Sequence, residues 1–278
     1  MTEFAYAKLN LTLEVGEKRT DGYHELRSVM TSASLCDVVD VEKTAEVTLV
    51  CDRADLPTDR RNLAVKAAEV FFAETGMDGG CNIRLDKRIP SEAGLGGGSS
   101  DAAAVLRALR TLYAPELPDG ELEAIGARVG SDVPYCIRRG TVLCRGRGES
   151  MTDLTDMPAC RYVIVKPKEA FSTGVMYGAI DAENPPRRHT TDALTAGLTH
   201  GDLEAVAANL YNTFEAVVPA ISAVWTARRE LLNCGALNAM MSGSGSAVFG
   251  IFASPEQAER AFDTLQKRDW QVFLCKPV

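Results

Sequence analysis

The residues best suited to chemistry form a glycine-rich loop, Pro90-Ser91-Glu92-Ala93-Gly94-Leu95-Gly96-Gly97-Gly98-Ser99-Ser100. Glycines at this density let a backbone approach an anion closely. The loop runs into an alanine-rich segment, about 99–113, whose apolar residues recur at helical spacing. Because free N–H groups at a helix start attract anions, we predict that the loop cradles a phosphate. A flexible surface turn is the alternative, although a turn needs only one or two glycines.

The glycine loop differs from two common nucleotide-binding motifs. It lacks the Lys of G-x-x-x-x-G-K-[ST], and no glycine cluster in the chain fits G-x-G-x-x-G. A second cluster, Ser242-Gly243-Ser244-Gly245, precedes a predicted strand rather than a helix. Taken alone, this second cluster fits a hairpin turn equally well.

Three segments in order resemble the signatures of the GHMP kinases, the superfamily of galactokinase, homoserine kinase, mevalonate kinase and phosphomevalonate kinase. They are Ala5 to Leu11 (AYAKLNL), the loop from Pro90 to Ser100, and Met241 to Ala247. Two further runs, Asp21 to Leu26 (DGYHEL) and Gly130 to Tyr135 (GSDVPY), are most similar to the branch that phosphorylates 4-diphosphocytidyl-2-C-methyl-D-erythritol in the non-mevalonate isoprenoid pathway. The resemblance spans about residues 5–252.

The resemblance implies an α+β fold of two lobes with the active site between them. The N-terminal lobe would resemble domain 2 of ribosomal protein S5, and the C-terminal lobe would be ferredoxin-like. We predict the division at 1–150 and 151–278, because residues 147–160 are polar and rich in turn formers. The alternation of predicted strands and helices is compatible with this fold.

Local patterns predict several elements. Residues 4–15 and 33–51 are typical of strands, with a turn at 20–22 between them. A helix should begin at Asn62 and end at Gly76, and a last helix should begin at the capping box Ser254-Pro255-Glu256-Gln257. We also expect a polar loop over 182–192 and a helix over about 202–217.

The resemblance implies that Asp132 is the catalytic base and that Lys8 holds Asp132 ionised and stabilises the forming alkoxide. Asn10 would orient the acceptor hydroxyl or the Lys8 side chain. The structural alternatives are a helix-cap or turn role for Asp132, a solvent-exposed strand edge for Lys8, and backbone satisfaction by Asn10.

For the acceptor, the resemblance implies that an aromatic pair stacks on cytosine while the backbone of a histidine reads the base edge. Tyr23 and His24 match those positions, and Tyr177 is the expected second stacking face. Thr173 is expected to contact the substrate. The alternative for Tyr177 is a place in the core.

For ATP, the resemblance implies phosphate binding by residues 90–100. The adenine would lie near Asn62 and Lys87, although Asn62 also suits a helix cap. Magnesium would arrive with ATP, bound by the phosphates and Ser100 rather than by a dedicated protein site.

Composition excludes several other classes. Thirty basic against 38 acidic residues give a charge of −8, and no basic run exceeds Arg187-Arg188-His189, so we expect no nucleic-acid partner. No stretch suggests a membrane span or signal peptide, so we expect a cytoplasmic protein whose partners are ATP and a small molecule. The eight cysteines are scattered and the three histidines dispersed, which argues against disulfides and a zinc site. The oligomeric state is left open.

Two other functions remain possible from the sequence. A related kinase could use mevalonate or homoserine as its acceptor, but these contain no base for Tyr23 and His24 to recognise. A non-catalytic nucleotide-binding relative would be expected to lose Lys8 or Asp132, and the chain retains both.

Overall fold

The computed structural model describes all 278 residues. The chain forms two compact units: unit 1 comprises residues 1–7, 35–91 and 96–139, and unit 2 comprises 8–34, 92–95 and 140–278. The units do not coincide with a division at residue 150, because the first two strands contribute residues to both. The family-level division at that residue therefore stays a prediction.

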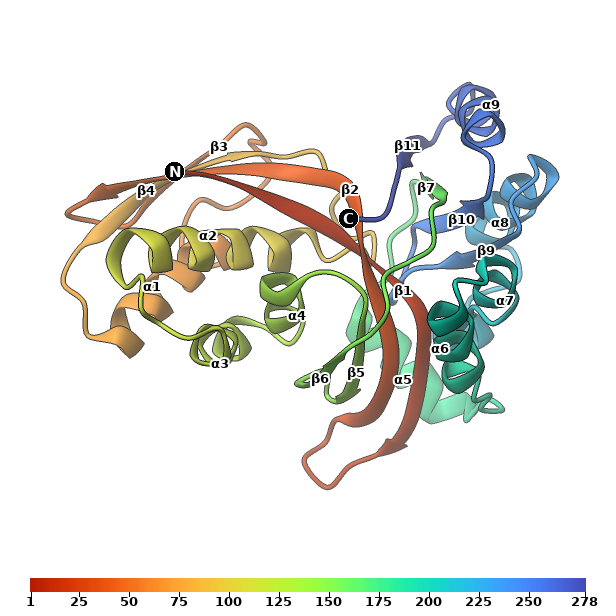
Figure 1. Ribbon diagram of the computed structural model, residues 1–278, viewed down its shortest axis with the longest axis horizontal. Helices are drawn as coiled ribbons and strands as arrows, with labels where there is room; N and C mark the ends of the chain where they lie inside the picture. The colour runs from red at the N-terminus through yellow and green to blue at the C-terminus, as the bar shows by residue number, and fades with distance from the viewer. The chain divides into compact units, whose positions relative to one another are not determined.

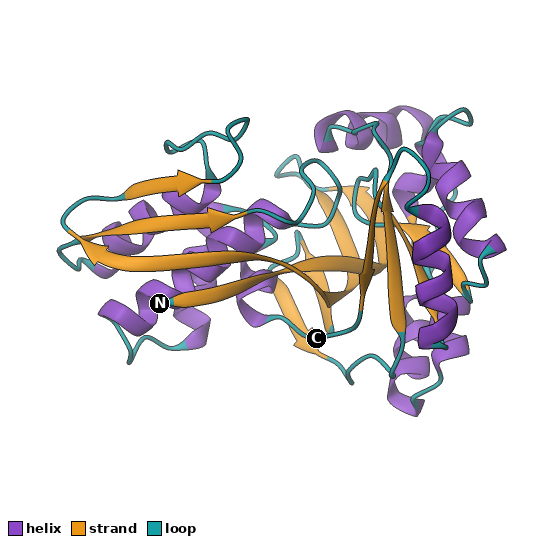
Figure 2. Ribbon diagram, turned by 90° about the horizontal axis from the view of Figure 1, so that it is seen from above, coloured by secondary structure: helices purple, strands orange, loops and turns teal.

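Unit 1 is a small sheet covered by helices. The strands are the first residues of β1 (Thr2–Lys18), the second half of β2 (His24–Thr44), β3 (Thr48–Cys51) and β4 (Gly80–Asp86). Strand β4 pairs antiparallel with β2 and parallel with β3. The helices are α1 (Leu63–Thr75), α2 (Gly97–Tyr113), α3 (Asp119–Val129) and α4 (Val133–Arg138). They lie on one face of the strands (Figure 1), and Figure 2 shows the same layers from above.

Helix α1 illustrates how local sequence sets element ends. The side chain of Asn62 accepts a hydrogen bond from the backbone of Ala64, and Gly76 ends the helix in the left-handed conformation with φ of 65°. Both caps confirm the prediction. Helix α1 packs on α2, and Phe71 of α1 and Leu106 and Leu109 of α2 are all fully buried.

Unit 2 contains an antiparallel sheet in the order β11-β7-β10-β9. Its strands are β7 (Arg161–Lys166), β9 (Asn238–Met241), β10 (Val248–Phe252) and β11 (Gln271–Cys275). Two helices pack on this sheet, α8 (Ala223–Asn233) and α9 (Pro255–Leu265). Ser254 caps α9 by accepting from the backbone of Gln257, which confirms the predicted start.

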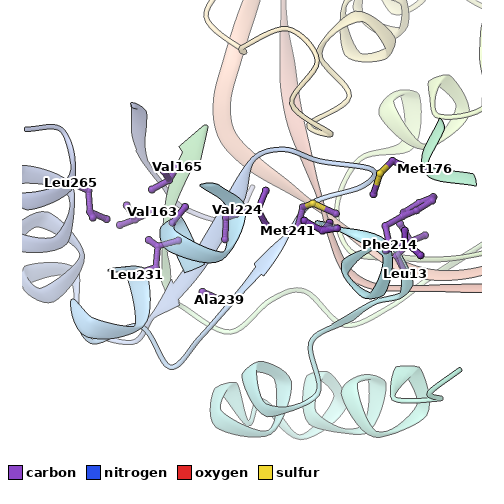
Figure 3. Packing of buried hydrophobic residues seen from close by; sticks show 14 of the residues in the cluster. Leu13, Val163, Val165, Met176, Phe214, Val224, Leu231, Ala239, Met241 and Leu265 are labelled. Carbon is purple, nitrogen blue, oxygen red and sulfur yellow. The ribbon is translucent and has the colours of Figure 1, made fainter. Parts of the chain in front are cut away.

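The remaining strands of unit 2 pair with the later part of β1 and with the first half of β2. Strand β1 (Thr2–Lys18) pairs in parallel with β8 (Tyr211–Asn212), and the first half of β2 pairs with β5 (Val142–Gly146), which pairs with β6 (Ser150–Asp153). Leu13 and Val15 of β1 join a buried apolar cluster with side chains of the helices and of the antiparallel sheet. Figure 3 shows Leu13, Met176 and Phe214 close together in this cluster.

Several predicted elements were wrong in extent. Part of the expected junction 147–160 is strand β6, which pairs with β5. Most of the expected polar loop remains, but α5 (Thr173–Glu183) and α6 (Thr191–His200) narrow it to 184–190. The expected helix over 202–217 is instead α7 (Leu203–Ala208), β8 and the 3₁₀ helix Thr213–Val217, because Asn212 caps a new turn through its side chain. No helix has the length and apolar character needed to cross a membrane.

Candidate functional site

Lys8 lies on β1 and is buried, with 5% of its surface exposed. Its ammonium donates to the Asn10 side-chain oxygen over 2.5 Å. Residues two apart on a strand point to the same face, which is why this pair can form. A buried charge needs such an acceptor, so Lys8 is not the solvent-exposed edge residue of the alternative interpretation.

The first half of the glycine loop packs against the second glycine cluster inside unit 2. The Ser242 hydroxyl donates to the Gly94 carbonyl over 3.0 Å, and the Ala247 amide donates to the Ala93 carbonyl over 3.1 Å. A Cβ on Gly94 would lie 2.0 Å from the Ser242 carbonyl oxygen. Gly94 also has a φ of +73°, so both its conformation and its contact require glycine.

This packing brings both glycine segments to Lys8. The Lys8 amide donates to the Leu95 carbonyl over 2.9 Å, and a Cβ on Gly243 would lie 3.0 Å from the Lys8 ammonium. The Asn212 side chain donates to the carbonyls of Met241 and Gly243, both over 2.8 Å. The second cluster does join two antiparallel strands, β9 and β10, as the hairpin interpretation required, but it also lies beside the buried ammonium.

The rest of the glycine loop forms the start of α2 in unit 1. Gly96 is the N-cap residue with φ of 69°, and no side chain caps the helix. The helix begins at Gly97, two residues before the predicted start. Its first N–H groups therefore lack a side-chain acceptor, as anion binding requires.

Ser100 lies in the first turn of α2 but is almost fully buried. Its hydroxyl donates to the Tyr6 carbonyl over 2.6 Å. The contact of Ser100 with magnesium stays a prediction. No group of three or more His, Cys, Asp or Glu residues is arranged to hold a metal ion.

Asp132, also in unit 1, occupies the N-cap position of α4. The structural alternative expected it to be a capping residue, but its side chain makes no capping hydrogen bond. The residue is half-buried. The Asp132 carboxylate therefore does not cap the start of α4, and its role as the base stays a prediction.

The two residues predicted at the adenine are engaged in other contacts. Asn62 caps α1 and also donates to the Pro57 carbonyl over 2.9 Å. The Lys87 ammonium bonds to Asp37 and, over 2.5 Å, to Asp101. The Lys87 side chain is 5% exposed. Contact of these two side chains with a nucleotide stays a prediction.

The cluster of Asp37, Lys87 and Asp101 was not found from the sequence. Burial raises the pKa of Asp101 to about 7, against the opposing effect of the Lys87 ammonium, while the nearby Asp37 carboxylate adds to the rise. One Asp101 oxygen is buried without a hydrogen-bond partner. The only local signal was the position of Asp101 directly after the glycine loop.

The predicted cytidine residues lie in unit 2. The rings of His24 and Tyr177 stack at 5.1 Å and 18°, and His24 Nε2 lies 2.7 Å from an Asp181 carboxylate oxygen. Tyr177 also meets Phe214 edge to face at 4.9 Å, so it is partly a core residue as the alternative proposed. Asp181, at the end of α5, was missed because that helix was not predicted.

Tyr23 and Thr173 complete the predicted set. Tyr23 is 57% exposed, and the Arg147 guanidinium lies 5.0 Å from the centre of its ring. The Thr173 hydroxyl lies 2.9 Å from that of Ser244. Thr173 is therefore joined to the second glycine cluster.

Comparisons with known proteins identify the class to which this chain belongs. A family model described as the GHMP kinases N terminal domain matches residues 62–140, and the GHMP kinases C terminal model matches 194–270. Solved structures of a mevalonate kinase from L. major (TM-score 0.78, 17% identity) and a homoserine kinase from Cytophaga hutchinsonii (TM-score 0.75, 18% identity) share the fold; each comparison covers 100% of this chain and at least 94% of the other. The predicted α+β GHMP kinase fold is confirmed.

More similar relatives define the family. A 4-diphosphocytidyl-2-C-methyl-D-erythritol kinase from Caldicellulosiruptor saccharolyticus is 41% identical over 97% of this chain and 94% of its own, and one from Clostridium beijerinckii is 39% identical over 99% of each. A crystal structure of 4-(cytidine 5'-diphospho)-2C-methyl-D-erythritol kinase has a TM-score of 0.85 and 33% identity, covering 100% of this chain and 99% of that one. The chain belongs to the 4-diphosphocytidyl-2-C-methyl-D-erythritol kinase family, which confirms the predicted kinase class.

Replacing Gly94 tests the packing of the two glycine segments. We expect Gly94→Ala to lower the free energy of unfolding by about 2 kcal/mol or more, because the new methyl group meets the Ser242 carbonyl. Gly201→Ala is the matched control, since Gly201 has a φ of +67° and open space around it. Urea denaturation of both variants separates the conformational cost from the steric one, and equal losses would contradict the required close approach.

The buried Asp101 should give stability a pH dependence. Its pKa rises on folding from 3.8 to about 7, so the native state binds the proton more tightly than the unfolded state does. Protonation of Asp101 therefore stabilises the native state at low pH, and this stabilisation is lost as the pH rises through about 7. Asp101→Asn removes the effect. We therefore expect the stability of Asp101→Asn relative to wild type to increase between pH 5 and pH 8 in urea denaturation. Asp78→Asn, at an exposed position of unit 1, should give a constant difference; a constant difference for Asp101→Asn would refute the raised pKa.

Proposed function

We propose that this protein transfers the γ-phosphoryl group of ATP to the 2-hydroxyl of 4-diphosphocytidyl-2-C-methyl-D-erythritol. The observation that carries the proposal is identity of 41% and 39% over nearly the whole chain with two kinases named for this acceptor. The acceptor would be a small molecule of the isoprenoid precursor pathway. The order of the two matched family models supports the proposed N- and C-terminal domains at 1–150 and 151–278.

The phosphates of ATP would be bound by the glycine loop. Its second half supplies the uncapped start of α2, which is suited to an anion by its free N–H groups and helix dipole. Its first half is held in place by the Ser242–Gly94 contact. Magnesium would accompany the nucleotide as part of the co-substrate and lower the charge on its phosphates.

The acceptor hydroxyl must lose its proton as it attacks. In the proposed reaction the Asp132 carboxylate accepts that proton, a new bond forms between the acceptor oxygen and the γ-phosphorus, and the bond from that phosphorus to the β-phosphate oxygen breaks to release ADP. The buried Lys8 ammonium stabilises the negative charge on the acceptor oxygen. Its bond to Asn10 supports this role, because it fixes the direction in which the ammonium points.

Cytidine recognition would use the residues around His24. Asp181 holds the imidazole against the Tyr177 ring, which supports a rigid backbone at His24 for reading the edge of the base. The exposed Tyr23 ring offers an aromatic face for stacking. The Thr173 hydroxyl, beside Ser244, would contact the acceptor. ATP as co-substrate accords with a cytoplasmic enzyme, which is part of this proposal.

Replacement of Asp132 tests the proposed base. We expect Asp132→Asn to lower kcat by at least about 10²-fold because the amide cannot accept the proton, while the Kd for ATP stays close to that of wild type. The assay is ADP release from Mg-ATP with 4-diphosphocytidyl-2-C-methyl-D-erythritol, mevalonate or homoserine supplied separately. Turnover should require the cytidine compound.

Asp119→Asn is the matched control, because Asp119 is an exposed acid in the first turn of α3 in the same unit. It should retain wild-type turnover. Full activity of Asp132→Asn would remove Asp132 from the mechanism. Turnover of mevalonate or homoserine by the wild type would replace the proposed acceptor, and ATP binding without any turnover would support a non-catalytic relative.

A further inference from the structure

A continuous line of buried hydrogen bonds leads away from Lys8. The ammonium donates to Asn10 Oδ1, Asn10 Nδ2 donates to Ser28 Oγ over 2.9 Å, and Ser28 Oγ donates to the Thr12 carbonyl over 2.6 Å. Asn10 and Ser28 are each 1% exposed and Thr12 is fully buried. Water therefore cannot substitute for any of these partners, so each bond restricts the next.

The chemistry of the donors gives this line a direction. The Ser28 hydroxyl has one hydrogen, and that hydrogen is committed to the Thr12 carbonyl. Ser28 can then only accept from Asn10, which must turn its NH₂ group toward Ser28. The amide oxygen of Asn10 consequently faces the Lys8 ammonium. A reversed amide would place its NH₂ group against the ammonium and its oxygen against a hydroxyl with no free hydrogen.

The far end of the line is also fixed. The Thr12 hydroxyl accepts from the Val29 amide over 3.0 Å, and its oxygen lies 2.9 Å from that of the Thr191 hydroxyl. Thr191 begins α6, and its amide and hydroxyl donate to the buried Glu14 carboxylate over 2.9 and 2.8 Å. The Thr12 backbone is thus held by β1, β2 and α6, so its carbonyl provides a rigid reference for the Ser28 hydroxyl.

We propose that Ser28 is a positioning residue: it fixes the amide of Asn10 and thereby directs the Lys8 ammonium. The inference rests on the proposed function, since it assumes that Lys8 acts on the acceptor oxygen. Ser28 itself need not touch the substrate. Its effect should therefore appear in the rate of the phosphoryl transfer and be transmitted entirely through Asn10.

The first test measures steady-state kinetics of Ser28→Ala with ATP and 4-diphosphocytidyl-2-C-methyl-D-erythritol. We expect kcat to fall about 10- to 100-fold, as for a misdirected catalytic group, and KM for ATP to change less than about 2-fold. Thr31→Val is the matched control, because Thr31 is another buried hydroxyl of β2 whose partner is Thr141. It should lower the melting temperature about as much as Ser28→Ala while leaving kcat unchanged. Equal losses of kcat in the two variants would overturn the proposal in favour of general destabilisation.

The second test is a double-mutant cycle with Asn10→Ala. If Ser28 acts through Asn10, adding Ser28→Ala to Asn10→Ala should cause no further loss of kcat. Multiplicative losses would overturn the proposal, since Ser28 would then act by another route. The proposed function is judged separately from the wild-type enzyme: absence of wild-type turnover refutes that function, whereas normal wild-type turnover with an unimpaired Ser28→Ala variant refutes only the positioning role.

Discussion

The burial of one ammonium group constrains much of unit 2. A charge removed from water must be matched by fixed polar atoms, and the Lys8 charge is met by the Asn10 oxygen. Both glycine segments contact this residue: the Lys8 amide donates a hydrogen bond to the Leu95 carbonyl, and Gly243 lies close to the Lys8 ammonium. A larger residue at Gly94 or Gly243 would separate the segments that enclose Lys8.

Strand β1 meets this constraint through its alternation. Lys8, Asn10, Thr12 and Glu14 lie on one face, and all are buried. The opposite face carries Leu9, Leu11, Leu13 and Val15, which are also buried. Alternating strands usually leave their polar face to solvent. Here the polar face is internal and its members are joined to β2 and α6, so β1 is both a core strand and the support of the proposed catalytic lysine.

Local rules explain which features could be predicted from the sequence. The caps at Asn62, Gly76 and Ser254 depend on residues within a few positions, and all three were correct. The glycine loop could be recognised because glycine density and a following helix are both local. Helix α5 was missed because Gly174 and Gly178 weaken its pattern, and the missing helix concealed Asp181.

Features that depend on contacts between residues far apart in the chain could not be predicted from the sequence. Asp37 is fifty residues from Lys87 in the chain, so no spacing rule connects them. Ser28 is eighteen residues from Asn10, and its importance depends on the pairing of two strands and on burial. The alternation of polar and apolar residues along β1 can be read from the sequence, but only the structure shows that the polar face is buried. Asp132, Tyr23 and Tyr177 were predicted as site residues only from the family resemblance. Their local sequence alone did not distinguish a functional role from that of a cap or core residue.

Transfer of the phosphoryl group to one particular hydroxyl can be tested by determining the structure of the product. The enzyme would be incubated with Mg-ATP and 4-diphosphocytidyl-2-C-methyl-D-erythritol, and the product examined by ³¹P and ¹³C NMR. We expect one new phosphomonoester, whose phosphorus couples to the carbon that bears the 2-hydroxyl and which forms in equal amount with ADP. Inorganic phosphate in place of the ester, or an ester at another hydroxyl, would contradict it.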